Sequence, residues 1–432
     1  MPIDLHEKFR LSLLNKLRPL AEAIRYNSGT YIDRVTIYPL HNLDRDIKRR
    51  KELAEPLSEF IGDTPLYHFV SEHLSQLLRD NYDYSNQSGL VSELPLFSGL
   101  DPAEYLVTAF ESLPWHYTVS FVLPAAFDVL LPQNTDERVL SNSIRLLRVT
   151  DKVQDLYPLE SGIERRDKST PLSLMGLMGL MDAPKESLPL GRILFQTQVK
   201  GFIGVFDRST PLRLAEARLK AFLGFLLADY TLEVSFLYVP TVPKSELVIH
   251  QGIDADWQYL RRHELDEDFK QLLPKLGINK TITREDKSSE GLLEEWVNLG
   301  CQRACAGFQD NKAARRLQLA ATWLFDSYAN NRDLLAFVQA MVSMEILLGE
   351  KEDEEVGIGS MLRNRCAFLI GRSHNEREEI IDQLKQIYQV RSKIVHTGKD
   401  RLTRDEVGML FQLRHYCGRV IERELEIATE TK

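Results

Sequence analysis

The feature that most constrains the fold of this chain is a change in hydrophobic pattern near Asp254. From there onward, one segment after another carries apolar residues at the three- and four-residue spacing of an amphipathic helix. These segments are DADWQYLRRHELDEDFKQLL, GLLEEWVNLGCQRACAGF, AARRLQLAATWLFDSYA, LLAFVQAMVSMEILLG, GIGSMLRNRCAFLIG, NEREEIIDQLKQIYQVRSKIVH and RDEVGMLFQLRHYCGRVIEREL. No constant repeat length relates them, so the pattern predicts a helical bundle and not a solenoid.

The residues before Asp254 mix helical and strand patterns. Helical spacing is found in the first twenty residues, in KRRKELAEPLSEFIG and in TPLRLAEARLKAFLGFLLADY. Strands are predicted at Tyr31 to Tyr38, at His116 to Pro124, in SIRLLRVTD, in TLEVSFLYVP, and as two short strands hinged at Gly201 between Arg192 and Phe206. We therefore expect an α+β fold. An N-terminal mixed α/β region would cover residues 1–250, a helical connector 251–311, and an all-helical domain 312–432.

Composition excludes several classes of protein. With 432 residues the chain is long enough for two or three domains, and 43% hydrophobic residues are too many for a mostly disordered chain. A net charge of −9 argues against a protein that coats nucleic acid through bulk positive charge, but it leaves room for a local basic site. Four cysteines in such a chain do not form a disulfide scaffold, so buried free thiols are expected.

No segment resembles a targeting or membrane signal. Charges interrupt the apolar residues of the N-terminus every three or four positions, unlike the core of a secretory signal. The most apolar stretch, Pro171 to Pro184, is bounded by prolines and is too short to cross a bilayer. A loop is predicted around it, from Gly162 to Leu190. We expect a cytoplasmic protein with no membrane partner.

The common catalytic motifs are absent from the sequence. GxxxxGK[ST], GxSxG and HExxH do not occur, and the histidines in the first 250 residues have no cluster of carboxylates or cysteines beside them. Cys301 and Cys305 form a CxxxC pair without a second pair or a nearby histidine. The expectation is that the protein uses neither a cofactor nor a metal ion.

One segment carries more information, IYQVRSKIVHTGKDRL from Ile387 to Leu402. Arg391 and His396 bracket four residues near the predicted end of a long helix, because Gly398 suits the left-handed position just after a helix C-terminus. Residues five apart on an ideal helix point about 140° away from each other. The two side chains therefore cannot converge in one chain unless the last turn unwinds or the arginine reaches around. Two antiparallel copies of the chain would bring both pairs into one cleft.

This segment and its helical context resemble the HEPN superfamily of helical ribonucleases, specifically its ApeA-like branch. Arg391 and His396 match the R-x(4–6)-H pattern of that family, with a polar residue after the arginine. A helix containing a glutamate, FVQAMVSMEILLG, and a helix containing arginines, SMLRNRCAFLIG, precede it in the same order as in the family. The resemblance covers Leu334 to Leu402 and says nothing about residues 1–250.

The resemblance implies a metal-independent endoribonuclease that acts as a homodimer with a composite active site. His396 would be the general base that activates a ribose 2′-OH, and Arg391 would stabilise the phosphorane. Ser392 would bind phosphate or orient His396, and Glu345 would orient Arg391. A local basic edge for RNA would be formed by Lys393, Lys399, Arg401 and Arg404. Proteins of this kind resemble anti-phage or toxin-like effectors that cut tRNA or other cellular RNA. The N-terminal region would then sense a phage-derived or cellular activator.

Other interpretations of the same residues stay open. Arg391 and His396 could serve only to stabilise the end of their helix. Glu345 faces the core side of an otherwise apolar helix and is expected to be buried, so it needs a partner. The candidates are Arg363, Arg365 and Arg391, and the ion pair could serve only to fix the helix register. The alternative function is a non-catalytic HEPN module that dimerises, or binds RNA or a nucleotide, as an adaptor.

Overall fold

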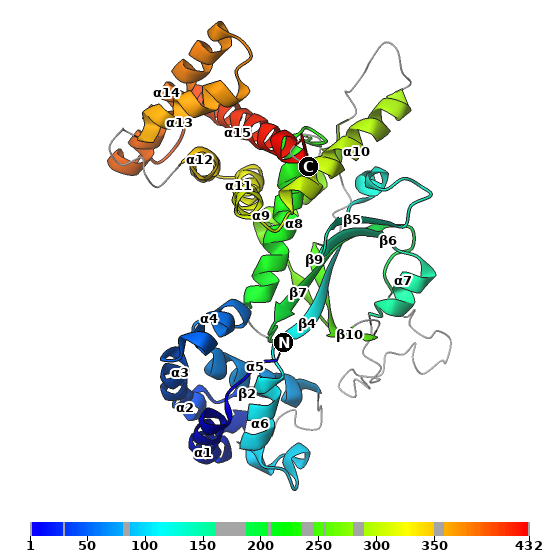
Figure 1. Ribbon diagram of the computed structural model, residues 1–432, viewed down its shortest axis with the longest axis vertical. Helices are drawn as coiled ribbons and strands as arrows, with labels where there is room; N and C mark the ends of the chain where they lie inside the picture. The colour runs from blue at the N-terminus through cyan, green and yellow to red at the C-terminus, as the bar shows by residue number, and fades with distance from the viewer. Residues whose placement is uncertain are drawn as a thin grey trace, which may run out of the picture. The chain divides into compact units, whose positions relative to one another are not determined.

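The chain folds into two compact units, and each is described here by itself (Figure 1). Unit 1 contains Met1–Tyr117, Gln198–Ala215 and Gln251–Ile253, and unit 2 contains Thr118–Thr197, Glu216–His250 and Asp254–Lys432. The structure is a computed structural model, and it describes residues 2–28, 31–80, 87–159, 187–205, 209–235, 245–253, 256–279, 289–349 and 358–430. The predicted α+β class is confirmed, with the sheets before residue 280 and a helical C-terminal region. The division into units differs from the three consecutive ranges expected from the sequence.

Unit 1 is mainly helical, with a small three-stranded sheet in the order β2-β1-β3. Its elements are α1 (Glu7–Ala23), β1 (Arg25–Asn27), β2 (Tyr31–Ile32), α2 (Arg34–Ile37), α3 (Leu40–Lys48), α4 (Lys51–Phe60), α5 (Pro65–Asp80), β3 (Gly89–Leu90), two 3-10 turns (Val91–Glu93 and Pro95–Phe97) and α6 (Pro102–Glu111). The N-terminal amphipathic helix is confirmed, because α1 buries Phe9, Leu13, Leu14, Leu17 and Ala21 on one side. Its apolar face lies in the core of the unit.

The strand predicted from Tyr31 to Tyr38 is largely wrong. Only Tyr31 and Ile32 form a strand, and α2 begins at Arg34. The reason is local, because the Asp33 carboxylate accepts a hydrogen bond from the Val35 N–H (2.9 Å) and caps the new helix. This cap outweighs the strand signal of the segment, which came from its β-branched residues and its alternating pattern.

Unit 2 contains most of a six-stranded sheet in the order β10-β9-β4-β7-β6-β5. Its strands are β4 (Trp115–Val122), β5 (Glu137–Ser141), β6 (Ile144–Arg148), β7 (Ile193–Gly201), β9 (Glu246–Ile253) and β10 (Asp256–Glu264). β6 is antiparallel to both β5 and β7. Helix α8 (Thr210–Ala228) packs on the sheet, where the rings of Phe222 and Phe195 stack at 5.2 Å. The strands predicted at His116–Pro124 and in SIRLLRVTD are confirmed, as is the α8 helix.

Two expectations about this sheet need correction. β7 is one strand that ends at Gly201, where two strands hinged at that glycine were expected. Gly201 has a φ of 141°, which a side chain disfavours, and a Cβ there would lie 2.6 Å from the Phe60 carbonyl oxygen. Residues Asp256–Glu264 form β10, where a helix was expected. Pairing at the edge of a larger sheet overrides the helical spacing of that segment.

The interval 251–311 is therefore not a helical connector. It contains β10, then α9 (Glu267–Leu272), a 3-10 turn (Leu273–Lys275), β11 (Leu276–Ile278) and the whole of α10 (Ser289–Gly307). β11 pairs with β8 (Leu232–Val234) in a separate two-stranded sheet. Unit 2 also holds a 3-10 segment (Ala125–Leu130) and α7 (Asp151–Leu156).

The remaining helices confirm the predicted C-terminal helical region. They are α11 (Lys312–Ala329), α12 (Asp333–Leu348), α13 (Ile358–Ile370), α14 (His374–Thr397) and α15 (Arg404–Glu430). Buried polar groups join them across the core. The Ser343 hydroxyl of α12 donates to the Ala320 carbonyl of α11 (2.8 Å), and the Cys417 thiol of α15 donates to the Ala340 carbonyl of α12 (3.3 Å). All four cysteines are free, and all but Cys305 are buried.

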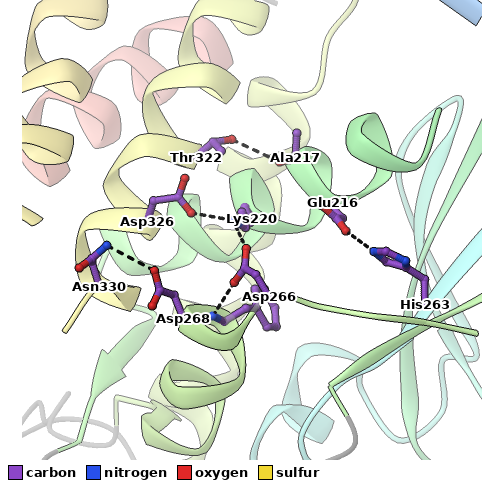
Figure 2. Close-up of polar contacts among 10 residues, drawn as sticks. Glu216, Ala217, Lys220, His263, Asp266, Asp268, Thr322, Asp326 and Asn330 are labelled. Carbon is purple, nitrogen blue, oxygen red and sulfur yellow. Dashed lines mark hydrogen bonds and ion pairs between the residues drawn. The ribbon is translucent and has the colours of Figure 1, made fainter. Parts of the chain in front are cut away.

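A polar network fixes α8 against its neighbours in unit 2 (Figure 2). The Lys220 ammonium on α8 lies 3.1 Å from Asp266 beside α9 and 2.8 Å from Asp326 on α11. One turn earlier on α8, Glu216 accepts a bond from His263 of β10 (2.9 Å). α8 is thus held by polar contacts at two successive turns, to β10 at Glu216 and to α9 and α11 at Lys220. These contacts position α11 relative to the sheet.

Part of the sequence prediction lies outside the described residues. The loop predicted at Gly162–Leu190 and the apolar stretch Pro171–Pro184 fall almost wholly in residues 160–186, which the structure does not describe. Among the helices that are described, none combines the length and apolar character needed to cross a bilayer.

Candidate functional site

Helix α14 carries the Arg391–His396 motif, and both of its ends are well defined. At the start, the Ser373 side chain accepts from the Glu376 N–H (3.2 Å), while the Glu376 carboxylate accepts from the Arg372 N–H (2.8 Å). At the other end, Gly398 adopts the left-handed conformation with φ 64° and ψ 38°. The predicted helix end near His396 is confirmed, because α14 extends through Thr397.

Arg391 is held by a carboxylate from another helix. Its Nη2 lies 3.4 Å from the Oε1 of Glu345 on α12. Arg391 is therefore the partner of Glu345 among the three arginines proposed from the sequence. Arg365 instead donates from Nη1 to the Leu348 carbonyl at the end of α12 (2.7 Å). Glu345 is less buried than expected, since 33% of its side chain and 38% of that of Arg391 are exposed. An incoming ligand could therefore reach the guanidinium.

Tyr388 lies one turn before Arg391 on α14 and faces inward. Its hydroxyl oxygen is buried and has no hydrogen-bond partner among the described residues. Burial and the nearby Glu345 carboxylate raise the pKa of Tyr388, while Arg391 and Arg363 act in the opposite direction. A Cβ on Gly359 of α13 would lie 3.4 Å from the Tyr388 ring. The ring is thus packed between α13 and α14.

His396 lies on the last turn of α14 and is exposed. Because the helix remains regular through Thr397, Arg391 and His396 are separated by about 140° around its axis and about 7.5 Å along it. The unwinding that would align them within one chain does not occur. Ser392 and Lys393, between them in sequence, are exposed as well.

The basic residues after the motif differ in their surroundings. Lys399 lies 2.7 Å from Glu406 on α15, and both side chains are largely buried. Burial alone would raise the pKa of Glu406, but bonds from Lys399 and Thr403 hold this pKa below its usual value. Lys399 therefore fixes the loop between α14 and α15. Arg401 and Arg404 are exposed, so their charges are available at the surface.

The sequence reasoning missed Glu406, although a signal for it was present. Thr403 and Glu406 form a T-x-x-E capping box at the start of α15, in which the Thr403 N–H donates to the Glu406 carboxylate (2.7 Å). That pattern places Glu406 directly after the loop that holds Lys399 and Arg401. Recognising it would have predicted that one lysine of the basic edge has an internal carboxylate partner.

The cysteines are poor candidates for chemistry. Burial raises the pKa of Cys301 to about 11 and that of Cys366 to about 12, so both thiols are protonated near neutral pH. Within the described ranges, no group of three or more histidine, cysteine, aspartate or glutamate side chains is arranged to hold a metal ion.

The structure thus brings Arg391 and Glu345 together and leaves His396 and Ser392 on the surface of the same helix end. A guanidinium fixed by a carboxylate can bind a phosphate oxygen, and an exposed imidazole can transfer a proton. No family model, no curated protein and no solved structure matches the chain. Function is therefore inferred from the residues themselves.

Proposed function

We propose that helices α11–α15 form a HEPN-like domain that cleaves RNA without a metal ion. The observation that carries the proposal is the contact between Arg391 and Glu345, five residues before an exposed histidine on the same helix. A partly exposed guanidinium that is already oriented by a carboxylate suits the recognition of a phosphate group. The exposed imidazole of His396 adds a group that can transfer a proton, which a purely structural ion pair does not need.

In the proposed reaction, His396 removes the proton from a ribose 2′-OH. The resulting oxygen attacks the adjacent phosphorus, and the bond from phosphorus to the 5′-oxygen breaks. The products are a 2′,3′-cyclic phosphate and a 5′-OH, with the leaving oxygen protonated by a second acid. Arg391 binds the non-bridging oxygens and stabilises their charge in the transition state. Because the 2′-OH is the nucleophile, DNA is not a substrate.

A homodimer supplies the second acid in this proposal. Arg391 and His396 diverge on the regular helix α14, so one chain presents its base and its guanidinium in different directions. In an antiparallel pair, the partner's His396 would protonate the leaving oxygen. Lys393, Arg401 and Arg404 would bind flanking phosphates, while Lys399 would order the loop through Glu406.

The proposed biological role is that of a cytoplasmic anti-phage or toxin-like effector that cuts tRNA or other cellular RNA. A ribonuclease of this kind must be silent until needed, and this requirement assigns regulation to the N-terminal part of the chain. A phage-derived or cellular activator would act there.

The test is incubation of purified protein with total cellular RNA in EDTA, followed by mapping of the cleaved ends. The wild type is expected to leave 2′,3′-cyclic phosphates, and His396→Ala and Arg391→Ala to leave the RNA intact. His374→Ala is the matched control, because His374 is an exposed histidine at the opposite end of the same helix. Cleavage that persists in His396→Ala would refute the proposed base.

The alternative, a non-catalytic binding module, is favoured by the divergence of Arg391 and His396 within one chain. In that case the wild type cleaves nothing, while RNA or a nucleotide still binds, and Arg391→Ala weakens that binding. Expression toxicity provides the deciding measurement. Toxicity that disappears with His396→Ala supports the enzyme waiting for its activator, and toxicity unchanged by this substitution supports the module.

A further inference from the structure

Helix α3 in unit 1 has one buried and one exposed side, and the exposed side has an unusual composition. Its buried side is formed by Leu40, Leu43, Asp44 and Ile47. The exposed residues, here called the α3 face, are Asn42, Arg45 and Lys48 of α3 with Tyr38 and Arg49 in the turns that flank it, where the backbone keeps helical angles. Since these positions follow one another at three- and four-residue intervals, they lie along one stripe of the helix. The stripe begins with an aromatic ring and ends with basic side chains.

The aromatic end of the α3 face belongs to a series of packed rings. Tyr38 is 68% exposed, and its ring meets the edge of the His41 ring with centroids 5.1 Å apart. His41 in turn stacks on Tyr67 of α5 at 4.1 Å with an interplanar angle of 19°. The exposed tyrosine is thus supported from behind by two further rings.

A buried carboxylate fixes these rings in place. Asp44 accepts hydrogen bonds from the Leu66 N–H (2.8 Å) and the Tyr67 N–H (3.2 Å) at the start of α5, and His41 Nδ1 lies 3.9 Å from its Oδ2. Burial raises the pKa of Asp44, partly offset by these two backbone bonds. Because α3 and α5 are joined at this point, the ring platform exists before any ligand arrives. Binding to it would cost little ordering entropy.

The basic end of the α3 face carries excess positive charge. Five of the seven residues from Arg45 to Lys51 are basic and one, Asp46, is acidic. Asp46 is shared between Lys16 (2.7 Å) and Arg49 (3.4 Å). Arg45, Lys48 and Lys51 are exposed, and none of them forms an ion pair with another described residue. On a protein with a net charge of −9, this is a local positive surface that can attract phosphates.

We propose that the α3 face binds single-stranded nucleic acid. Tyr38 offers an exposed ring on which an unpaired base can stack, and Arg45 and Lys48 lie along the same stripe to bind the backbone phosphates. Single strands are favoured over duplexes because bases inside a helix do not expose their faces. A lipid surface fits less well, since α3 buries its own Leu40, Leu43 and Ile47 and presents no apolar stripe.

This inference goes beyond the proposed ribonuclease and does not depend on it. The residues of the α3 face all lie in unit 1, whereas the Arg391–His396 motif lies in unit 2. The binding experiment therefore uses full-length protein with His396→Ala, Lys393→Ser, Arg401→Ser and Arg404→Ser, so that neither cleavage nor the exposed part of the C-terminal basic edge contributes. A failed cleavage assay leaves this measurement intact.

Fluorescence anisotropy with labelled 12-nucleotide oligouridylate and oligothymidylate measures binding in that background. Tyr38→Ala is expected to weaken binding by between about five- and a hundredfold, and Tyr38→Phe, which keeps the ring, to preserve it. Arg45→Ser is expected to weaken binding. It should also reduce the slope of the logarithm of the association constant against the logarithm of the salt concentration by about 0.7 in magnitude. Arg79→Ser is the control, because it removes an exposed charge from α5 about 18 Å from Tyr67 along that helix. It is expected to change neither the binding affinity nor its salt dependence.

The two probes distinguish the sources of the ligand. Tighter binding of oligouridylate assigns the α3 face to RNA, and equal binding assigns it to either single strand. Equal affinity for a 12-base-pair RNA duplex would overturn the proposal, as would Tyr38→Ala binding as tightly as Tyr38→Phe. Tight binding to phosphatidylserine vesicles, with no binding of either oligonucleotide, would assign the face to a membrane surface instead.

Discussion

The carboxylate of Glu345 on α12 lies 3.4 Å from the guanidinium of Arg391 on α14, and about a third of each side chain is exposed. Water screens an ion pair of this exposure, so it contributes no more than about 1 kcal/mol to the free energy of unfolding. Its main consequence is therefore orientation. The contact limits the directions in which Arg391 can point and joins the motif helix to a helix of the core.

Glu345→Gln is expected to reduce RNA cleavage at least about tenfold while changing the free energy of unfolding by less than about 1 kcal/mol. The amide keeps the size of the side chain but loses the charge that orients Arg391. End-mapped cleavage rates and urea unfolding curves measure the two effects. Glu378→Gln, at an exposed position on α14, is the control. A large loss of stability with unchanged cleavage would show that the pair is purely structural.

Replacing either of two helical glycines in unit 2 by alanine is expected to change the stability of the protein, in opposite directions at the two positions. A Cβ on Gly224 of α8 would lie 2.2 Å from the Ala321 carbonyl oxygen on α11, whereas nothing lies within 4 Å of a Cβ on Gly408 of α15. Gly224→Ala should destabilise the protein by about 1–3 kcal/mol through overpacking. Gly408→Ala should stabilise it by about 0.5–1 kcal/mol through helix propensity. Thermal unfolding measures both, and shifts in the same direction would contradict this packing of α8 on α11.

Unit 1 contains a histidine whose burial makes stability depend on pH. Burial lowers the pKa of His73 from 6.5 to about 4, and its ring stacks between Phe69 and Tyr105. The unfolded chain takes up a proton below about pH 6.5, while the folded state stays neutral until about pH 4. Stability therefore falls as pH drops through this window, by up to roughly 3 kcal/mol.

His73→Phe keeps a stacked ring and removes the titrating group. Urea unfolding at pH 5 and pH 7.5 is expected to show a smaller loss of stability at pH 5 for the variant than for the wild type. An identical pH dependence in both proteins would mean that His73 is more accessible to protons than its burial indicates.

The Lys220 network is expected to be sensitive to the loss of its ammonium, which two carboxylates share. Lys220→Met leaves Asp266 and Asp326 close together without the ammonium between them, and because both carboxylates are only partly buried we expect a loss of about 1–2 kcal/mol. Adding Asp326→Asn to Lys220→Met should recover part of that loss, because one of the two partly buried carboxylate charges is removed. Lys270→Met, which breaks the exposed pair with Glu264, should leave the unfolding curve unchanged. Equal effects of Lys220→Met and Lys270→Met would refute the assigned role.

The long helices could be predicted from the sequence because their periodic apolar faces extend over four turns or more. α1, α8, α11, α14 and α15 all bury the side that the spacing indicated. The errors at Tyr31–Tyr38 and Asp256–Glu264 have a different cause. In the first a single Asp33 side chain caps a helix, and in the second a neighbouring strand decides the conformation. Neither a cap geometry nor a sheet edge is visible in local periodicity.

The candidate site shows the same division between local and distant contacts. The end of α14 at Gly398 follows from one glycine and was predictable, whereas the choice of Arg391 over Arg363 and Arg365 as partner of Glu345 depends on how three helices pack. The platform of Tyr38, His41 and Tyr67 needs α3 and α5 side by side, so the basic run KRRK alone gave no reason to look there.

Unit 1 is assembled from three separate stretches of the chain, the last of which ends at Ile253. During synthesis at about 5–20 residues per second, this unit cannot be complete until roughly 10–50 seconds after translation begins. By then the strands from β4 to β9 have also been made. The N-terminal unit is therefore not an appendage that folds first and can be cut away or exchanged at one boundary. Any loss or transfer of unit 1 by recombination would have to reconnect the chain at several points.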